Sequence, residues 1–314
     1  MLTIEQTSAL TRRITALSVG VAVVLTVIKA AAWWYSDSVS MLASLADSGL
    51  DVAASLATFF AVRYAVTPPD REHRYGHGKA EAFASLTQAG LVFASCALVG
   101  EEAVSHLLHA KPIAYEVPSL VVMAVSMLLT AGLVWAQSRV LHAARSVAVE
   151  GDRMHYAADF ASNVISFAGI AVAALLHSPQ ADALAGLLVA AWLLWGAIGV
   201  FRRASGELMD RELSDDARRQ VRNLMREDAR VLDVHQLRMR ASGPYIHIQM
   251  HASLEPALSL IEAHQVMVAA EKRVLEAFPA ADIIIHPDPR GAAEPHGGAF
   301  GESAETHRAA AQVR

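Results

Sequence analysis

The sequence has almost no cysteine and little charge. A single cysteine, Cys96, among 314 residues excludes a disulfide framework and any cysteine-rich zinc module. Charged residues make up only 18% of the chain and the formal net charge is −5, which excludes a general nucleic-acid binder. No His-Glu-x-x-His segment occurs, so the sequence has no zinc-protease helix.

The few charges are also unevenly spread along the chain. Hydrophobic residues make up 54% of the sequence, and more than half of the charged residues lie in the last third, positions 203–314. A soluble domain of about 200 residues could not cover its surface with the charges that remain. We therefore predict that the first two-thirds is a membrane domain and the last third a soluble domain.

Six apolar stretches are each long enough to cross a bilayer, which takes roughly 20 residues. Aromatic residues typical of membrane interfaces, such as Trp33 and Trp34, lie near their ends. The six expected spans are 14–34, 39–66, 82–108, 117–141, 155–176 and 181–201.

The orientation follows from lysine and arginine in the short connections. The second and fourth connections are basic, whereas the first and fifth have no lysine or arginine and the third has only Lys111. Arg12 and Arg13 also precede the first span. We therefore expect both chain ends in the cytoplasm.

The pattern changes after residue 201. A helix is expected over 215–229, behind the cap signal Ser214-Asp215-Asp216, and a second over 258–278. A hairpin is expected over 231–239 and 245–254, and Ile283-Ile284-Ile285 reads as a short buried strand. This α-β-β-α-β order predicts a small α+β domain of the metallochaperone-like kind.

These observations predict four regions. Residues 1–13 form a cytoplasmic N-terminal segment, and 14–202 form a six-helix, all-α transmembrane transport domain. Residues 205–290 form the cytoplasmic α+β domain. From about 291 to 314 glycine, alanine, proline and glutamate dominate, and we predict a disordered tail.

Two predicted spans carry paired polar residues at helical spacing. Asp47 and Asp51 are four residues apart, as are His155 and Asp159, so each pair lies on one helical face. Charges inside a membrane are costly and are functional candidates by default. If the two faces meet, three carboxylates and one imidazole surround one point, which suits tetrahedral Zn²⁺.

A less specific interpretation exists for each of these residues taken alone. A single membrane aspartate can be a hydrogen-bond acceptor between helices, and His155 could face the headgroups. The cluster, however, predicts exchange chemistry. Three carboxylates cannot all stay ionised without a cation, so protons should enter when the metal leaves.

Three ordered motifs resemble the cation diffusion facilitator family, closest to its bacterial ferrous-iron/zinc efflux branch. They are Ser40-Met41-Leu42-Ala43-Ser44-Leu45-Ala46-Asp47-Ser48 with Asp51, then Tyr75-Gly76-His77-Gly78-Lys79-Ala80-Glu81, then His155-Tyr156-Ala157-Ala158-Asp159. The resemblance covers about residues 10–290. It implies a homodimeric metal/proton antiporter in membrane lipid, with six spans and a cytoplasmic metal-binding domain.

The resemblance also implies three metal sites, of which the first is the transport site deduced above from spacing. A loop site corresponds to Asp70, His73 and His77, although such a segment can also be a solvated turn. The implied cytoplasmic site is binuclear, with Asp288 able to bridge, and its residues are His235, His251, His264, His286 and Asp288.

Read without the family, His264 alone on an amphipathic helix is typical of a polar face. His247 has no role in the family pattern and is interpreted as structural. The resemblance also implies a charge pair at the dimer centre, which maps to Lys79 and Asp210.

The sequence thus predicts a transporter and no enzyme. The expected cargo is Zn²⁺, with Cd²⁺ and Fe²⁺ as further candidates, and the expected location is the bacterial cytoplasmic (inner) membrane. A membrane metalloprotease lacks its motif here, and a di-iron hydroxylase would need more histidine boxes than His73-x-x-x-His77. A membrane-anchored metal sensor or buffer remains as the alternative.

Overall fold

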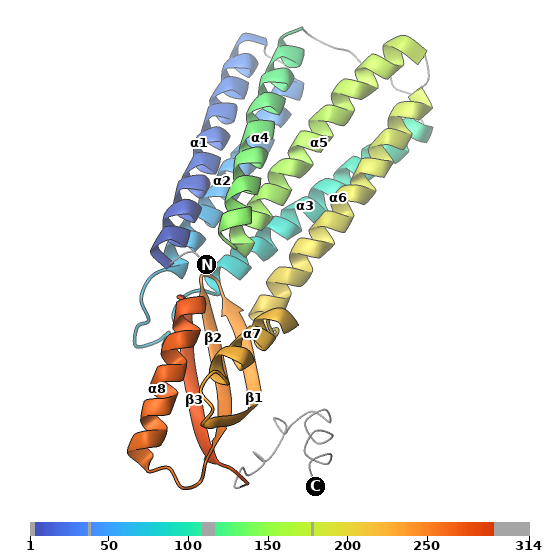
Figure 1. Cartoon of the computed structure of the whole chain (residues 1–314). Helices are drawn as coiled ribbons and strands as arrows, with labels where there is room; N and C mark the ends of the chain where they lie inside the picture. The colour runs from blue at the N-terminus through green and yellow to red at the C-terminus, as the bar shows by residue number, and fades with distance from the viewer. Residues whose placement is uncertain (1–3, 37–38, 109–116, 177–178, 292–314) are drawn as a thin grey trace. The chain divides into compact units, whose positions relative to one another are not determined.

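The computed structural model describes residues 4–36, 39–108, 117–176 and 179–291. The chain forms two compact units, Glu5–Met209 and a second that begins at Asp210. The first has helices as its only regular secondary structure within the described residues, and the second combines helices with a three-stranded sheet (Figure 1). The predicted fold class is therefore confirmed. The predicted disordered tail, residues 291–314, lies outside the described residues apart from Gly291.

Six long helices make up the first unit. They are α1 (Ile4–Ser36), α2 (Val39–Ala65), α3 (Ala80–Leu108), α4 (Val117–Ala143), α5 (Val147–Leu176) and α6 (Pro179–Leu208). Within the described residues, four of them contain a stretch that is long and apolar enough to cross a membrane: Glu5–Tyr35, Ser44–Ala65, Ala80–Ser105 and Val121–Ala143.

Small side chains bring α3, α5 and α6 close together. One buried cluster joins Ala89 and Val92 of α3 to Ala158 of α5 and to Leu193 and Ala197 of α6. Small residues let helix backbones approach closely, which is how helices gain packing energy in lipid. Because α5 also packs against α2 and α4, it lies at the centre of the helical unit.

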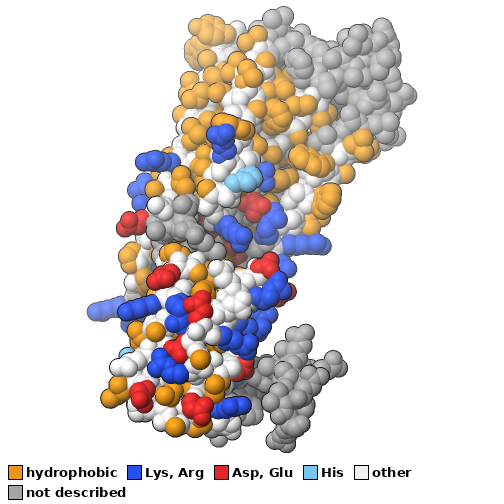
Figure 2. Space-filling model, in the orientation of Figure 1, with side chains coloured by type: hydrophobic (Ala, Val, Ile, Leu, Met, Phe, Trp, Pro, Cys, Tyr) orange, Lys and Arg blue, Asp and Glu red, His pale blue; other side chains and the backbone are white. Residues whose placement is uncertain are grey.

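The outer surface of the helical unit is apolar. On the face drawn in Figure 2, hydrophobic side chains cover most of this unit, whereas charged side chains concentrate on the other unit. Large aromatic residues are exposed, among them Trp34, Trp135 and Trp195. The guanidinium carbon of Arg139 lies 4.3 Å from the centre of the Trp135 ring, a cation–π contact. Exposed tryptophan beside a cation is typical of a membrane interface.

The second unit follows the predicted α-β-β-α-β order. Its elements are α7 (Asp215–Met225), β1 (Val231–Ser242), β2 (Tyr245–Leu254), α8 (Leu260–Ala277) and β3 (Ala281–Pro289). β1 and β2 form an antiparallel hairpin, and β3 pairs with β2 in parallel after the α8 crossover. The sheet order is β1-β2-β3.

Local signals explain where these elements begin and turn. The hydroxyl of Ser214 caps α7 by accepting from the Ala217 amide, as the sequence predicts. Ser259 and Glu262 form a capping box at the start of α8. Gly243 has a φ of 56°, which allows the tight Gly243-Pro244 turn of the hairpin.

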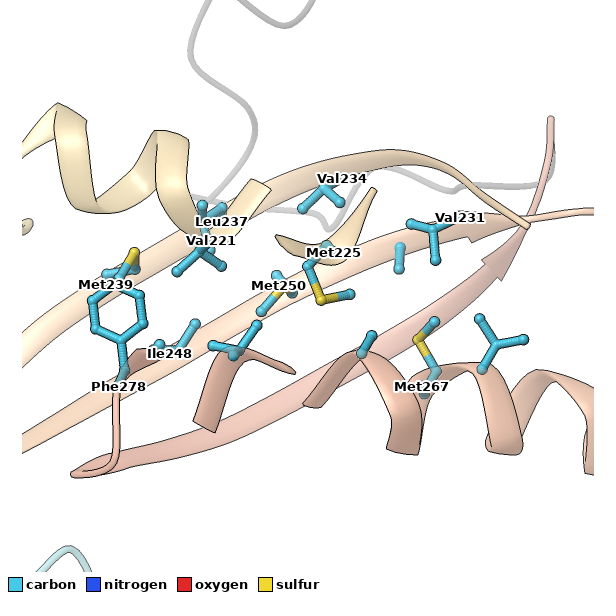
Figure 3. Close-up of a cluster of buried hydrophobic side chains, with 14 of the residues drawn as sticks. Val221, Met225, Val231, Val234, Leu237, Met239, Ile248, Met250, Met267 and Phe278 are labelled. Atoms are coloured by element: carbon cyan, nitrogen blue, oxygen red, sulfur yellow. The ribbon is translucent and has the colours of Figure 1, made fainter. Parts of the chain in front are cut away.

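One hydrophobic core holds this unit together (Figure 3). Val221 and Met225 of α7 meet Ile248 and Met250 of β2, and Val266 of α8 belongs to the same cluster. Both helices therefore cover one face of the sheet. The opposite face is left open for polar side chains.

Two sequence expectations need correction. β3 is longer than Ile283–Ile285 and is not fully buried, because Ile284 is 57% exposed on the open face of the sheet. Helix α5 begins at Val147, eight residues before the expected start of the fifth span at His155. The polar run Glu150–Arg153 belongs to this helix. Two of its residues, Gly151 and Asp152, are buried.

Candidate metal centre

Three polar residues meet inside the helical unit. Nε2 of His155 lies 3.0 Å from Oδ1 of Asp51 and 3.7 Å from Oδ2 of Asp159. Asp51 comes from α2, and the other two residues lie one turn apart on α5. Asp51 and His155 are 8% and 5% exposed. The potential ligand atoms of the three residues lie within 4.8 Å of one another, a spacing that one metal ion can bridge.

The fourth expected transport ligand, Asp47, lies one turn before Asp51 on α2. Its side chain is exposed, and it is not part of the described group of ligand atoms within 4.8 Å. About one turn before Asp47, the Ser44 carbonyl of α2 accepts a 3.3 Å hydrogen bond from the Lys29 ammonium. The structure thus brings together three of the four residues and leaves the fourth beside them.

The connection between α2 and α3 gathers the three expected loop residues. His77 Nε2 lies 3.2 Å from Asp70 Oδ2, and His73 Nδ1 lies 3.4 Å from Asp70 Oδ1. The backbone amides of His73 and Glu72 both donate to the Asp70 carboxylate. These hydrogen bonds lower the pKa of Asp70. Gly76 makes the turn with a φ of 81°. An ionised carboxylate and two imidazoles suit a divalent ion.

A third cluster lies on the open face of the sheet. His235 of β1 pairs with His251 of β2, which pairs with His286 of β3. Asp288 lies at their centre. Its Oδ2 is 2.8 Å from His251 Nδ1 and 3.2 Å from His235 Nε2, and its Oδ1 is 3.3 Å from His286 Nε2. One carboxylate thus contacts three histidines, and each comes from a different strand.

A bulge in β1 makes this arrangement compatible with the core. The extra residue lies between His235 and Arg238, where Gln236 has a φ of 48°. It lets His235 face the open side while Leu237 and Met239 remain in the core. Strict alternation would place all three side chains on one face.

The remaining sequence-predicted histidines are placed differently. His264 is exposed on α8, which packs on the other face of the sheet, and it is outside the described group formed by His235, His251 and Asp288. His247, interpreted from sequence as structural, has a carboxylate partner of its own, since its Nδ1 lies 3.2 Å from Asp282 Oδ2.

Several nitrogens of these clusters are suited to accept a metal. Among the described residues, the buried Nε2 atoms of His77 and His235 have no hydrogen-bond partner. Each faces a carboxylate oxygen at 3.2 Å. A neutral imidazole nitrogen and a carboxylate are both acceptors, so a cation placed between them would satisfy both.

The two residues of the expected dimer charge pair belong to different units. The Lys79 ammonium donates to the Leu208 carbonyl at 3.2 Å. Asp210 accepts a 2.7 Å hydrogen bond from Nη1 of Arg240. Each residue has a local partner in its own unit.

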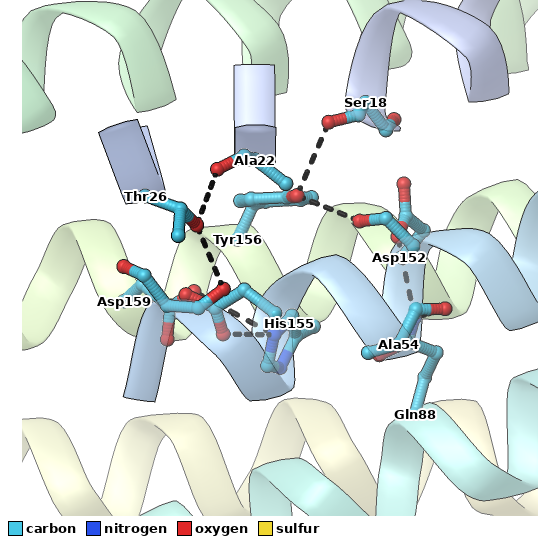
Figure 4. Close-up of polar contacts among 12 residues, drawn as sticks. Ser18, Ala22, Thr26, Ala54, Gln88, Asp152, His155, Tyr156 and Asp159 are labelled. Carbon is cyan, nitrogen blue, oxygen red and sulfur yellow. Dashed lines mark hydrogen bonds and ion pairs between the residues drawn. The ribbon is translucent and has the colours of Figure 1, made fainter. Parts of the chain in front are cut away.

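Sequence reasoning missed a buried polar network next to the membrane cluster (Figure 4). Its centre is Asp152 of α5, which is 0% exposed. Gln88 of α3 and Gln137 of α4 donate to its two oxygens. A signal was present, because positions 152, 155 and 159 follow the i, i+3, i+7 spacing of one helix face.

Comparisons with known proteins cover nearly all of the described chain. A family model for the "Cation efflux transmembrane domain" matches residues 15–209, and one for the "Cation efflux protein, cytoplasmic domain" matches 213–290. A relative from Shewanella oneidensis, "Cation-efflux pump FieF", is 41% identical, with 87% of this chain and 92% of that protein covered. Proteins of the same name from Cronobacter sakazakii and Yersinia enterocolitica are each 38% identical. They cover 86% and 85% of this chain and 89% and 88% of their own lengths.

Proposed function

Since the chain belongs to the cation diffusion facilitator family of cation-efflux transporters, we propose that it exports Zn²⁺ from the cytoplasm in exchange for protons. The observation that carries this proposal is the buried cluster of Asp51, His155 and Asp159, which two helices build inside an apolar helical unit. Asp47 completes the proposed tetrahedral site by turning inward when the ion binds.

The donor set supports zinc as the cargo. Carboxylate oxygens and one imidazole nitrogen are ligands that Zn²⁺ accepts in four-coordinate sites. Cd²⁺ and Fe²⁺ are proposed as further cargoes, because imidazole and carboxylate sites admit several divalent ions. The site has too few oxygen ligands for Ca²⁺ and no thiolate for Cu⁺.

The same cluster supports exchange for protons. Three carboxylates close together repel one another when all are ionised, so an empty site takes up protons. A divalent ion displaces them, because its ligands must be deprotonated. Inward-facing and outward-facing forms of the site would therefore carry metal one way and protons the other.

The remaining sites are given supporting roles. The loop cluster of Asp70, His73 and His77 and the sheet cluster centred on Asp288 would bind metal on the cytoplasmic side. We propose that the chain works as a homodimer in the bacterial inner membrane, with both ends in the cytoplasm. Lys79 and Asp210 would form the charge pair at the dimer centre.

A flux measurement tests the proposal. Purified full-length protein is reconstituted into proteoliposomes, and zinc and pH dyes are read together for each ion, with and without a pH gradient. Zinc movement that carries protons in the opposite direction is expected. A membrane-anchored metal buffer would bind zinc and move none, and zinc flux with no proton counterflow would rule out antiport.

The ligand chemistry predicts a change of selectivity in His155→Asp. The substitution makes the site all oxygen, which favours harder ions such as Mn²⁺ over Zn²⁺ and Cd²⁺. Competition flux assays should show the Zn²⁺/Mn²⁺ preference falling by roughly 10-fold or more, by analogy with the effect of changing a metal site's immediate partners. An unchanged preference would place the selectivity elsewhere in the chain.

A further inference from the structure

Side chains from five helices meet around Asp152, and Figure 4 shows part of this network. Gln137 Nε2 of α4 donates to Oδ2 at 2.8 Å and also contacts Ser18 Oγ of α1 at 3.1 Å. Gln88 Nε2 of α3 donates to Oδ1 at 3.2 Å and lies 3.0 Å from Thr58 Oγ1 of α2. Asp152 itself comes from α5. A carboxylate so enclosed is shielded from water on all sides.

The charge of this carboxylate has no direct cationic partner. Within the described residues, no lysine or arginine nitrogen forms an ion pair with Asp152, and its two oxygens face neutral amides. The titratable groups that act on it are Asp51 of α2, and His155 and Tyr156 of α5. A buried, unpaired carboxylate is costly unless it can take up a proton.

One of the two glutamines, Gln137, can turn to accept a hydrogen bond from a protonated carboxyl. Gln88 Oε1 and Gln137 Oε1 are buried and, within the described part of the chain, have no hydrogen-bond partner. Gln88 Nε2 also donates to the Ala54 carbonyl at 3.2 Å, which fixes the orientation of that amide. A half-turn of the Gln137 amide exchanges its NH₂ for its carbonyl, because its other neighbour, the Ser18 hydroxyl, can donate as well as accept. The carbonyl then accepts from the O–H of a protonated Asp152, whereas the ionised form uses both NH₂ groups. The network can therefore satisfy either protonation state without moving the backbone.

From these contacts we propose that Asp152 is a proton-binding site of the transporter, distinct from the metal ligands. The inference rests on the proposed function, since it assigns part of the proton side of the exchange. One proton adds to the carboxylate to give the neutral acid, and the same proton leaves when the acid ionises. Asp152 lies one turn from His155 on α5, so the charge of a bound metal acts on it through a short distance.

Tyr156 links this site to the metal cluster. Its hydroxyl lies 2.7 Å from Ser55 Oγ of α2 and donates to the Ser18 carbonyl of α1 at 3.4 Å. Ser18 also contacts Gln137, so α1, α2 and α5 share one polar network around both sites. A shift of α5 that reshapes the metal site must therefore also rearrange the partners of Asp152.

The test is the proton-to-zinc ratio of Asp152→Asn in proteoliposomes of the full-length protein. Asparagine has the same shape and remains neutral, so it resembles the protonated state at every pH. We expect about one proton fewer per zinc ion than in the wild-type protein, because the variant can no longer load or release that proton. The matched control, Asp216→Asn on the exposed start of α7, should keep the wild-type ratio.

The outcomes separate this inference from the function on which it rests. If the wild-type protein moves zinc without protons, antiport itself is wrong. If Asp152→Asn is slower than the wild-type protein but keeps its ratio, Asp152 is only structural and the inference is overturned. Should Asp152→Asn not fold, Gln137→Met removes one amide donor and leaves the acid in place. Loss of a donor favours the protonated form, so the pH midpoint of transport should rise, and an unchanged midpoint overturns the inference.

Discussion

Replacing Asp51 by alanine is expected to stop zinc transport while the protein remains a folded dimer. Asp51 is the α2 residue whose carboxylate lies 3.0 Å from His155, and it is buried. Losing a residue that only supports a metal ligand typically costs 10- to 100-fold in affinity or activity. Removing a ligand itself should therefore lower zinc flux by roughly 100-fold or more, and Asp159→Ala should do the same.

The control for this experiment is Asp228→Ala in the other unit. Hydrogen bonds from Arg230 lower the pKa of Asp228 to about 2, so it is an ionised carboxylate, and it is remote in sequence from all four proposed transport ligands. Flux in vesicles, normalised to the amount of dimer by size-exclusion chromatography, gives the measurement. Full zinc flux from purified Asp51→Ala would contradict the proposal that Asp51 is a ligand of the transport site.

The second large effect is expected from Asp288→Ala, measured on the isolated 205–290 fragment. This fragment has its own hydrophobic core, and one carboxylate joins histidines from all three strands. Zinc at about 1,000 times its Kd should stabilise the fragment by about 4 kcal/mol, or more than about 15 °C in Tm. Without Asp288 most of that rise should disappear, which thermal unfolding with and without zinc will show.

The matched comparison is Asp282→Ala. Asp282 lies on β3, as Asp288 does, but it is the carboxylate partner of His247. It should keep most of the zinc-induced rise. In the full-length protein, Asp288→Ala should impair transport less than Asp51→Ala, because Asp51 is a proposed ligand of the moving ion and Asp288 is not. Equal and complete loss of flux at saturating zinc would instead place the sheet cluster on the translocation path.

The sequence predicts the meeting of three of the four expected membrane residues because helical spacing is a strong constraint. Residues four apart on a helix share a face, so Asp51, His155 and Asp159 need only the contact between α2 and α5 to meet. The soluble elements are also foreseeable, because alternation and cap residues such as Ser214 and Ser259 are local signals. Both are cases in which neighbours in sequence determine the geometry.

What the sequence does not predict depends on packing between distant segments. Asp152 precedes the apolar run, so hydropathy excludes it from the span. Its helical spacing places it on the face of His155 and Asp159, but the contacts with Gln88 and Gln137 that enclose it come from other helices. The β1 bulge likewise breaks the alternation that would have oriented His235. Ile284 is exposed because α7 and α8 both cover the other face of the sheet. Three consecutive isoleucines do not indicate which face of the strand the helices will cover.

The Trp135–Arg139 contact has a consequence for voltage. A tryptophan ring of this kind marks the headgroup level, and Gln137 is two residues, or about 3 Å, further along α4. Asp152, which Gln137 contacts, is therefore expected near this end of the membrane, with His155 and Asp159 roughly 5 and 10 Å further along α5 toward the bilayer centre. A membrane potential acts in proportion to the depth that a charge crosses, about 2.3 kcal/mol per charge for a full crossing at 100 mV. The potential across the membrane would thus act more strongly on the loading of the proposed metal site than on a proton at Asp152.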